Sequence, residues 1–112
     1  MELRTLHYFL TVAREQSISA AAESLHISQP ALSTQLKGME DELGKQLLIR
    51  GTKGSRKVVL TEEGMILRRR AEEILSLVQK AEEEITRSDE NIVGDVVIGA
   101  GETDSVRLLA QT

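Results

Sequence analysis

The chain has 112 residues and a net charge of −4, with 40% apolar and 29% charged residues, which is typical of a soluble globular protein with a small domain and an extension. Tyr8 and Phe9 are its only aromatic residues, which argues against a single-strand binder built on stacked rings, and the absence of cysteine excludes disulfides and thiolate metal sites. No apolar run reaches membrane-spanning length and no signal peptide begins the chain, so we expect a cytoplasmic protein without membrane contact or bound metal.

The first predicted helix covers residues 2–16, because its apolar residues repeat at helical spacing: Leu3, Leu6, Leu10 and Ala13, with Phe9 alongside. We expect its role to be structural, with the apolar face covering the two short helices that follow.

Residues 17–39 predict these two short helices, set at an angle across a tight turn. The first begins near Ser19, a good N-cap, and continues to Leu25. The second begins at Ser28, again an N-cap type, with Pro30 in its first turn, where a missing N–H costs nothing. The two residues between the helices leave room only for a turn.

The second short helix has two faces of different chemistry. Its apolar face is formed by Leu32, Leu36, Met39 and Leu43. Its other face has no carboxylate before Glu40 and carries Gln29, Ser33, Thr34, Gln35 and Lys37. Amides and hydroxyls can pair with base edges, and a lysine can meet a phosphate. The hypothesis is a DNA-binding helix-turn-helix, and the alternative is an αα-corner with a solvated polar face.

Gly44 is expected to end this helix, and two short apolar runs follow, residues 47–49 and 58–60. A loop with two glycines and four cations separates them, so the pattern predicts a β-hairpin wing with a basic tip. A solvated loop is the alternative reading of the charge run. Residues 28–61 hold six cations against three anions, a balance of +3, whereas residues 62–90 hold five against nine, a balance of −4. The basic charge therefore lies beside the proposed reading helix.

Thr61 is a good N-cap for a long helix that we expect to continue to about Ser88. Its apolar residues are spaced by alternating steps of four and three, as in a coiled-coil seam: Leu67, Ala71, Ile74, Val78, Ala81 and Ile85. This seam predicts pairing with a second copy, and a lone helix folded back on its own domain is the alternative. Residues 93–98 then predict a short strand that opens a second domain.

Three motifs taken together resemble the N-terminal DNA-binding domain of LysR-type transcriptional regulators: A-A-x-x-L-H-I-S-Q-P-A-L-S-x-Q-L, then E-x-E-L-G, then L-T-E-E-G. The resemblance covers roughly residues 1–107. It implies a mainly α fold, with a winged helix-turn-helix over residues 1–60 and a linker or dimerisation helix over 61–90. Residues 91–112 would be the first strand of an α/β effector domain, which would bind a small-molecule inducer.

The resemblance also implies which residues contact DNA. In the reading helix and wing these are Ser28, Gln29, Pro30, Ser33, Thr34, Lys37, Arg50, Lys53, Arg56 and Lys57. Many family members carry arginine where this chain has Thr34, and a phenylalanine where it has Leu48. The wing also looks longer than usual.

The sequence thus predicts a double-stranded DNA-binding module of a transcriptional regulator, acting as a homodimer or, in the full-length protein, a tetramer. No cofactor or catalysis is expected in this chain, because it holds no activated nucleophile, paired carboxylates in a cleft or metal cluster. Two other classes stay open at this point: a helical interaction module without specific DNA readout, and an enzyme with a G-x-G nucleotide loop at residues 99–101.

Overall fold

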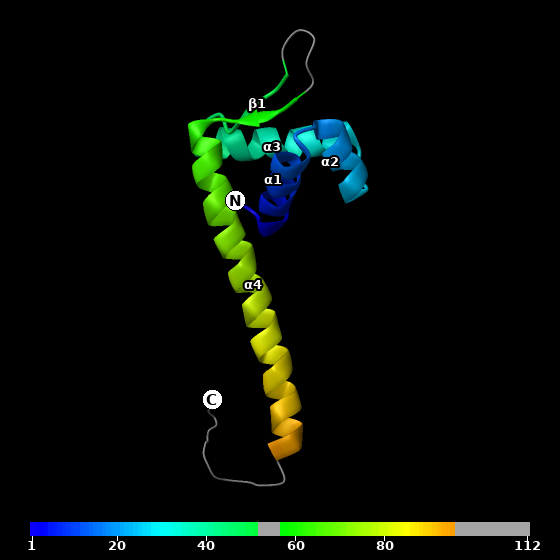
Figure 1. Cartoon of the computed structure of the whole chain (residues 1–112), viewed down its shortest axis with the longest axis vertical. Helices are drawn as coiled ribbons and strands as arrows, with labels where there is room; N and C mark the ends of the chain where they lie inside the picture. The colour runs from blue at the N-terminus through cyan, green and yellow to red at the C-terminus, as the bar shows by residue number, and fades with distance from the viewer. Residues whose placement is uncertain (52–56, 96–112) are drawn as a thin grey trace. The chain divides into compact units, whose positions relative to one another are not determined.

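The computed structural model describes residues 1–51 and 57–95. Within them the elements are α1 (Leu3–Glu15), α2 (Ile18–Leu25), α3 (Gln29–Leu43), β1 (Leu48–Ile49), β2 (Val59–Leu60) and α4 (Glu62–Asp95) (Figure 1). The chain divides into two units, Met1–Ser76 and Leu77–Thr112, and all elements except the later part of α4 belong to the first. A mainly helical winged helix-turn-helix followed by a long helix is confirmed.

Local capping signals set the helix boundaries. The Ser28 hydroxyl accepts a hydrogen bond from the Ala31 amide at 3.2 Å, so α3 begins where the sequence predicted. Gly44 ends α3 with a φ of 68°, a left-handed conformation that glycine adopts without strain. The N-cap of α2 is Ser17 and not Ser19 as predicted. Extended backbone at Ser17 lets its hydroxyl accept from the Ala20 amide at 3.1 Å.

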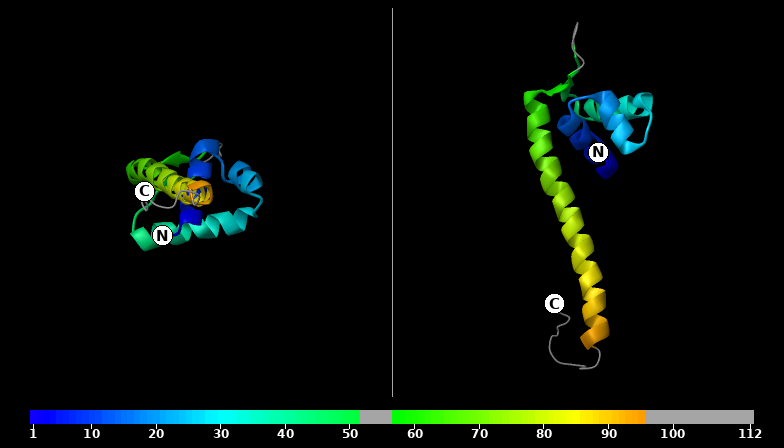
Figure 2. Two further views of the ribbon diagram at one scale, coloured as in Figure 1. Left: turned by 90° about the horizontal axis from the view of Figure 1, so that it is seen from below. Right: turned by 45° about the vertical axis from the view of Figure 1, so that its right-hand side comes forward.

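Helices α1, α2 and α3 enclose one apolar core, to which the start of α4 also contributes (Figures 1 and 2). The largest fully buried side chains are Phe9, Val12, Leu32, Leu36 and Leu48. Leu48 of β1 therefore fills part of the core volume. Because α3 buries its apolar face here, its polar face is left at the surface.

The wing is an antiparallel pair of short strands, as predicted, with Leu48 opposite Leu60 and Ile49 opposite Val59. Leu48 is buried and Leu60 packs against the core, whereas the Ile49–Val59 pair is exposed. This follows from the strand period of two, since directly opposed residues share a face of the sheet.

Helix α4 begins with Thr61 as its cap, whose hydroxyl accepts from the Gly64 amide at 3.0 Å. The helix continues to Asp95, beyond the predicted end, because the polar residues at 88–91 include no proline or glycine to break it. Val93 and the two residues after it are thus helical and not in the predicted strand. The rest of that strand lies outside the described residues. No helix in the described part of the chain combines the length and the apolarity that a membrane crossing needs.

Candidate nucleic-acid interface

The outward face of α3 carries hydrogen-bonding groups that no other described residue engages. Gln29 and Thr34 are exposed and Ser33 is half-buried, and none of the three makes a hydrogen bond to the rest of the described chain. Pro30 is exposed beside them in the first turn. These residues lie within the first two turns of one helix, so the structure brings the predicted base-reading positions together on one surface.

Two of the predicted contact residues on α3 are already engaged within the chain. The Ser28 hydroxyl caps the helix, as predicted, and Lys37 lies 3.8 Å from the Asp41 carboxylate one turn later. Both side chains of this pair are well exposed, so the pairing is weak and Lys37 can exchange it for a phosphate.

Glu40 attaches the wing to α3. One oxygen of its carboxylate accepts hydrogen bonds from the Leu47 and Leu48 amides, at 2.8 and 3.1 Å. The other oxygen lies 3.9 Å from the guanidinium of Arg50, and the Glu40 side chain is only 12% exposed. A single carboxylate from α3 thus fixes both the entry to β1 and the basic residue that follows it.

The returning strand is held at a second point, where the Val58 amide donates to the carbonyl of Gln16 at 3.0 Å. Gln16 ends α1 in a left-handed conformation, which directs its carbonyl out of the helix. Lys57, immediately before Val58, is exposed. Arg50 therefore follows β1 and Lys57 precedes β2, both at the loop end of the wing, while Lys53 and Arg56 lie outside the described residues.

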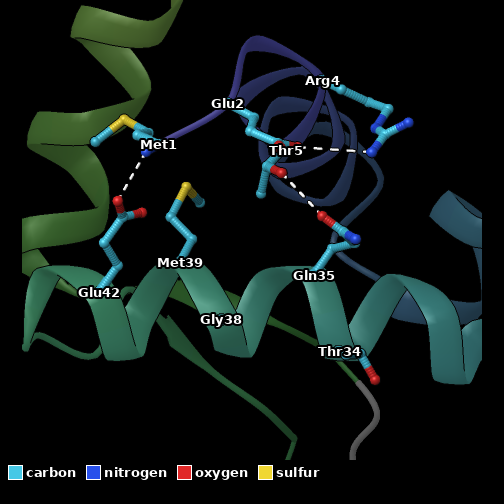
Figure 3. A pocket seen from close by; sticks show the side chains of 9 residues that line it. All are labelled: Met1, Glu2, Arg4, Thr5, Thr34, Gln35, Gly38, Met39 and Glu42. Carbon is cyan, nitrogen blue, oxygen red and sulfur yellow. Dashed lines mark hydrogen bonds and ion pairs between the residues drawn. The ribbon is translucent and has the colours of Figure 1, made fainter.

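The other flank of α3 faces the N-terminal end of α1 across an open hollow of about 420 Å³ (Figure 3). The Thr5 hydroxyl donates to the side-chain oxygen of Gln35 at 3.0 Å, and the terminal ammonium of Met1 pairs with Glu42 at 2.9 Å. Figure 3 shows Gln35 pointing toward α1 and Thr34 pointing to the opposite side of the helix. Gln35 therefore makes a contact within the chain, unlike the side chains of Gln29, Ser33 and Thr34.

The predicted seam of α4 divides between two surroundings. Ala71 is fully buried in the core of its own chain, and Leu67 packs against that core. Val78 is half-buried and Ala81 exposed. Leu67 and Ala71 are therefore covered by their own domain, and helical periodicity does not say which of two adjacent apolar stripes that domain will cover. Apart from Met65, the large apolar side chains of α4 that are exposed form a stripe that shares two residues with the predicted seam: Ile66, Ile74, Leu77 and Ile85, between 37 and 65% exposed.

Sequence reasoning missed Glu40 as the attachment point of the wing and Ile66 as an exposed position on α4, whereas Leu77 was expected to widen the apolar stripe of that helix. Glu40 stood out only as the first carboxylate on α3, and nothing in the sequence says that two amides seven and eight residues later meet it. For Ile66 the signal was present, since it is apolar and lies at helical spacing from Ile74.

Comparison with known proteins identifies relatives over most of the chain. The family model for bacterial regulatory helix-turn-helix proteins of the lysR family matches residues 3–65. The HTH-type transcriptional regulator BsdA of Bacillus subtilis (strain 168) is 43% identical over 100 residues, which are 89% of this chain and 34% of that protein. The chain therefore spans about a third of the length of this relative.

Two further similarities cover more of the matching protein. The HTH-type transcriptional regulator BudR of Klebsiella aerogenes is 42% identical over 105 residues, which are 94% of this chain and 71% of that protein. The crystal structure of a BenM_DBD/catB site 1 DNA complex superposes with a TM-score of 0.75 at 44% identity, covering 81% of this chain and 95% of that one.

Proposed function

Because the chain belongs to the lysR family of bacterial regulatory helix-turn-helix proteins, we propose that it binds double-stranded DNA sequence-specifically, as the DNA-binding module of a transcriptional regulator. Helix α3 would enter the major groove with its outward face against the base edges. The wing would lie beside it on the backbone or in the minor groove. Such a module acts where bacterial DNA is, in the cytoplasm.

The observation that carries this proposal is the outward face of α3. An amide and two hydroxyls there are left without partners inside the described chain, on a helix that buries Leu32, Leu36 and Met39 of its opposite face in the core. Amides and hydroxyls are the groups that read base edges. The similarity to the BenM_DBD complex, which was solved with DNA, supports the same assignment.

The proposed DNA contacts fall into two kinds. Gln29, Ser33 and Thr34 would meet bases, with Pro30 packed beside them. Contacts to phosphates would come from the helix cap and the cations: Ser28, Lys37, Arg50, Lys53, Arg56 and Lys57. Since α3 has one outward cation in its first three turns, most of the salt-dependent affinity would come from the wing.

A salt titration of duplex binding tests the proposal against a purely protein-binding role. DNA selected in vitro from a random pool would be measured by gel shift at two or more salt concentrations. We expect the logarithm of the affinity to fall with the logarithm of salt concentration, with a slope of about −0.9 per neutralised phosphate. No enriched duplex, or a flat salt response, would leave the interaction module as the better assignment.

Two substitutions separate base readout from phosphate contact. Gln29→Ala should weaken binding to the selected site by about 2 kcal/mol while leaving non-specific binding unchanged. Lys37→Ala should weaken binding to all sequences alike and reduce the salt slope by about one. Equal loss of specific and non-specific affinity in Gln29→Ala would mean that Gln29 does not read bases.

We also propose that the module dimerises through α4, using the exposed stripe, which shares Ile74 and Ile85 with the predicted seam. Placing apolar side chains on an exposed helix face has a cost in water that a second copy removes. The charges on α4 favour an antiparallel pair. Residues 68–70 are all arginine and residues 82–84 are all glutamate, so an antiparallel pair brings unlike runs together, whereas a parallel pair opposes like with like.

The same antiparallel pairing matches the apolar residues. With the two-fold axis between Leu75 and Ser76, Ile66 lies opposite Ile85 of the second copy and Ile74 lies opposite Leu77. Every exposed isoleucine or leucine of the stripe then faces another. Two reading helices joined by a two-fold axis would read a two-fold related DNA site.

Cysteine cross-linking tests the orientation, because the natural chain contains no cysteine. The double variant Ile66→Cys/Ile85→Cys should form disulfide-linked dimers under mild oxidation, while each single variant should stay uncrosslinked. Cross-linking of Ile66→Cys alone would indicate a parallel pair. Absence of cross-links in all three variants would argue against pairing through this stripe.

The remaining domain assignment also stays a proposal. Residues 1–60 would form the DNA-binding domain, residues 61–90 the dimerisation helix, and residues 91–112 the approach to an effector domain that binds a small-molecule inducer. The length of the BsdA relative, about three times this chain, leaves room for such a domain.

A further inference from the structure

The outward face of α3 lacks the side chains that usually read guanine. Bidentate contacts from arginine or lysine are the commonest way to recognise that base. The first two turns of α3, residues 29–36, contain neither. The next cation along α3 is Lys37. Its ammonium nitrogen lies 3.8 Å from a carboxylate oxygen of Asp41, one turn further along the helix.

Thr34 is one of the exposed residues of this surface. It lines the edge of the hollow, and Figure 3 shows its side chain pointing away from α1. Its hydroxyl makes no hydrogen bond to the rest of the described chain. A short side chain at the crest of a helix reaches a base only when the helix lies deep in the groove, where the methyl group of thymine projects.

We propose that Thr34 sets the base preference of this module by packing its methyl group against the C5 methyl of a thymine. The preferred half-site then carries an A·T pair at the position facing Thr34, with an adenine nearby for the Gln29 amide. This inference rests on the proposed DNA-binding function and adds to it the base composition of the site and the residue that determines it.

The two methyl groups can be removed independently, one from the protein and one from the DNA. Thr34→Ser keeps the hydroxyl and loses the methyl, while deoxyuridine in place of thymidine loses the C5 methyl and keeps the pairing. Each change alone should weaken binding about fourfold, as expected for one buried methyl group. Combined, they should weaken binding no further, because either change already abolishes the contact. Thr34→Val, which keeps a methyl and loses the hydroxyl, should still distinguish thymidine from deoxyuridine.

The position facing Thr34 would be identified by in vitro selection with the full chain and with Thr34→Arg. The unchanged chain should enrich A·T at one half-site position, and Thr34→Arg should shift that position to guanine by about tenfold. Thr34 is exposed, so substituting it by serine, valine or arginine should leave the melting temperature of the protein unchanged.

The outcomes separate this inference from the proposed function. Enriched sites whose profile is the same for both chains, or additive losses in the methyl experiment, would overturn the role of Thr34 and leave DNA binding intact. Enrichment of a G·C pair at the affected position by the unchanged chain would do the same. If no duplex is enriched by either chain, the proposed function fails and this inference fails with it.

Discussion

Helices α3 and α4 each bury one face in the same core, but they leave surfaces of different chemistry exposed. On α3 the exposed groups are an amide and hydroxyls without partners in the described chain, and on α4 they are the isoleucines and leucine of the exposed stripe. Unpaired polar groups gain most from a partner with ordered donors and acceptors, and apolar groups from a partner that removes water. This difference supports the proposal that α3 binds nucleic acid and that α4 binds a second protein chain.

The two helices also differ in how they use glycine, and the largest predicted effect comes from α4. A Cβ on Gly64 would collide with the carbonyl oxygen of Leu47, which is backbone and cannot turn aside. Leu47 is held in place, since its amide donates to Glu40 and its carbonyl accepts from the Thr61 amide at 3.0 Å. Gly64→Ala should therefore lower the free energy of unfolding by about 4 kcal/mol, more than ordinary overpacking, as measured by urea denaturation. Near-native stability would mean that the start of α4 can move away from β1.

The second prediction concerns the connection between α3 and the wing. Glu40→Ala removes a nearly buried hydrogen-bond acceptor and leaves the Leu47 and Leu48 amides without a partner. The free energy of unfolding should therefore fall by about 3 kcal/mol. Glu42→Ala is the matched control on the same helix, because Glu42 makes only an exposed ion pair with the terminal ammonium. Its effect should stay within about 0.5 kcal/mol. Similar losses in both variants would show that Glu40 contributes only its charge.

How far the sequence predicts this molecule depends on the distance over which each signal acts. The caps at Ser28 and Gly44 and the pairing of the strands were predicted, because they depend on neighbouring residues. The role of Glu40 was not, because it depends on how α3 and the chain after it meet in three dimensions. Ala71 shows the intermediate case: its place on an apolar stripe was predicted, but its burial in its own domain was not.

The candidate DNA surface follows the same division. Periodicity alone placed Gln29 and Thr34 on the polar face of α3, and the structure exposes both. Gln35 was assigned to that face too, but the hydroxyl of Thr5, thirty residues earlier in the chain, engages it. A helical wheel cannot separate reading residues from residues at the edge of the core, because the boundary is drawn by the neighbouring helix.

The third prediction tests the exposed stripe of α4. Ile74→Asp places a charge where the second copy should pack and should weaken dimerisation by about 2 kcal/mol per substituted chain. Ser76→Asp introduces the same charge on an exposed position two residues away, on a different side of the helix, and should leave the dimer intact. Sedimentation equilibrium measures both. Dissociation by Ser76→Asp but not by Ile74→Asp would move the interface to the other side of α4.

The smallest predicted effect has the opposite sign and comes from the glycine of α3. A Cβ on Gly38 would meet nothing within 4 Å, and the residue lies in the helix interior with no need for a left-handed conformation. Glycine there only adds freedom to the unfolded chain, so Gly38→Ala should stabilise the protein by about 1 kcal/mol and raise the melting temperature by roughly 5 °C. A lower melting temperature would contradict the open surroundings of residue 38.

DNA affinity measured on Gly38→Ala bears on the comparison between the two helices. Greater stability together with weaker DNA binding would place residue 38 against the duplex, because packing within the chain alone cannot raise the stability and lower the affinity. Greater stability with unchanged affinity would confine the DNA surface to the side of α3 that carries Gln29 and Thr34.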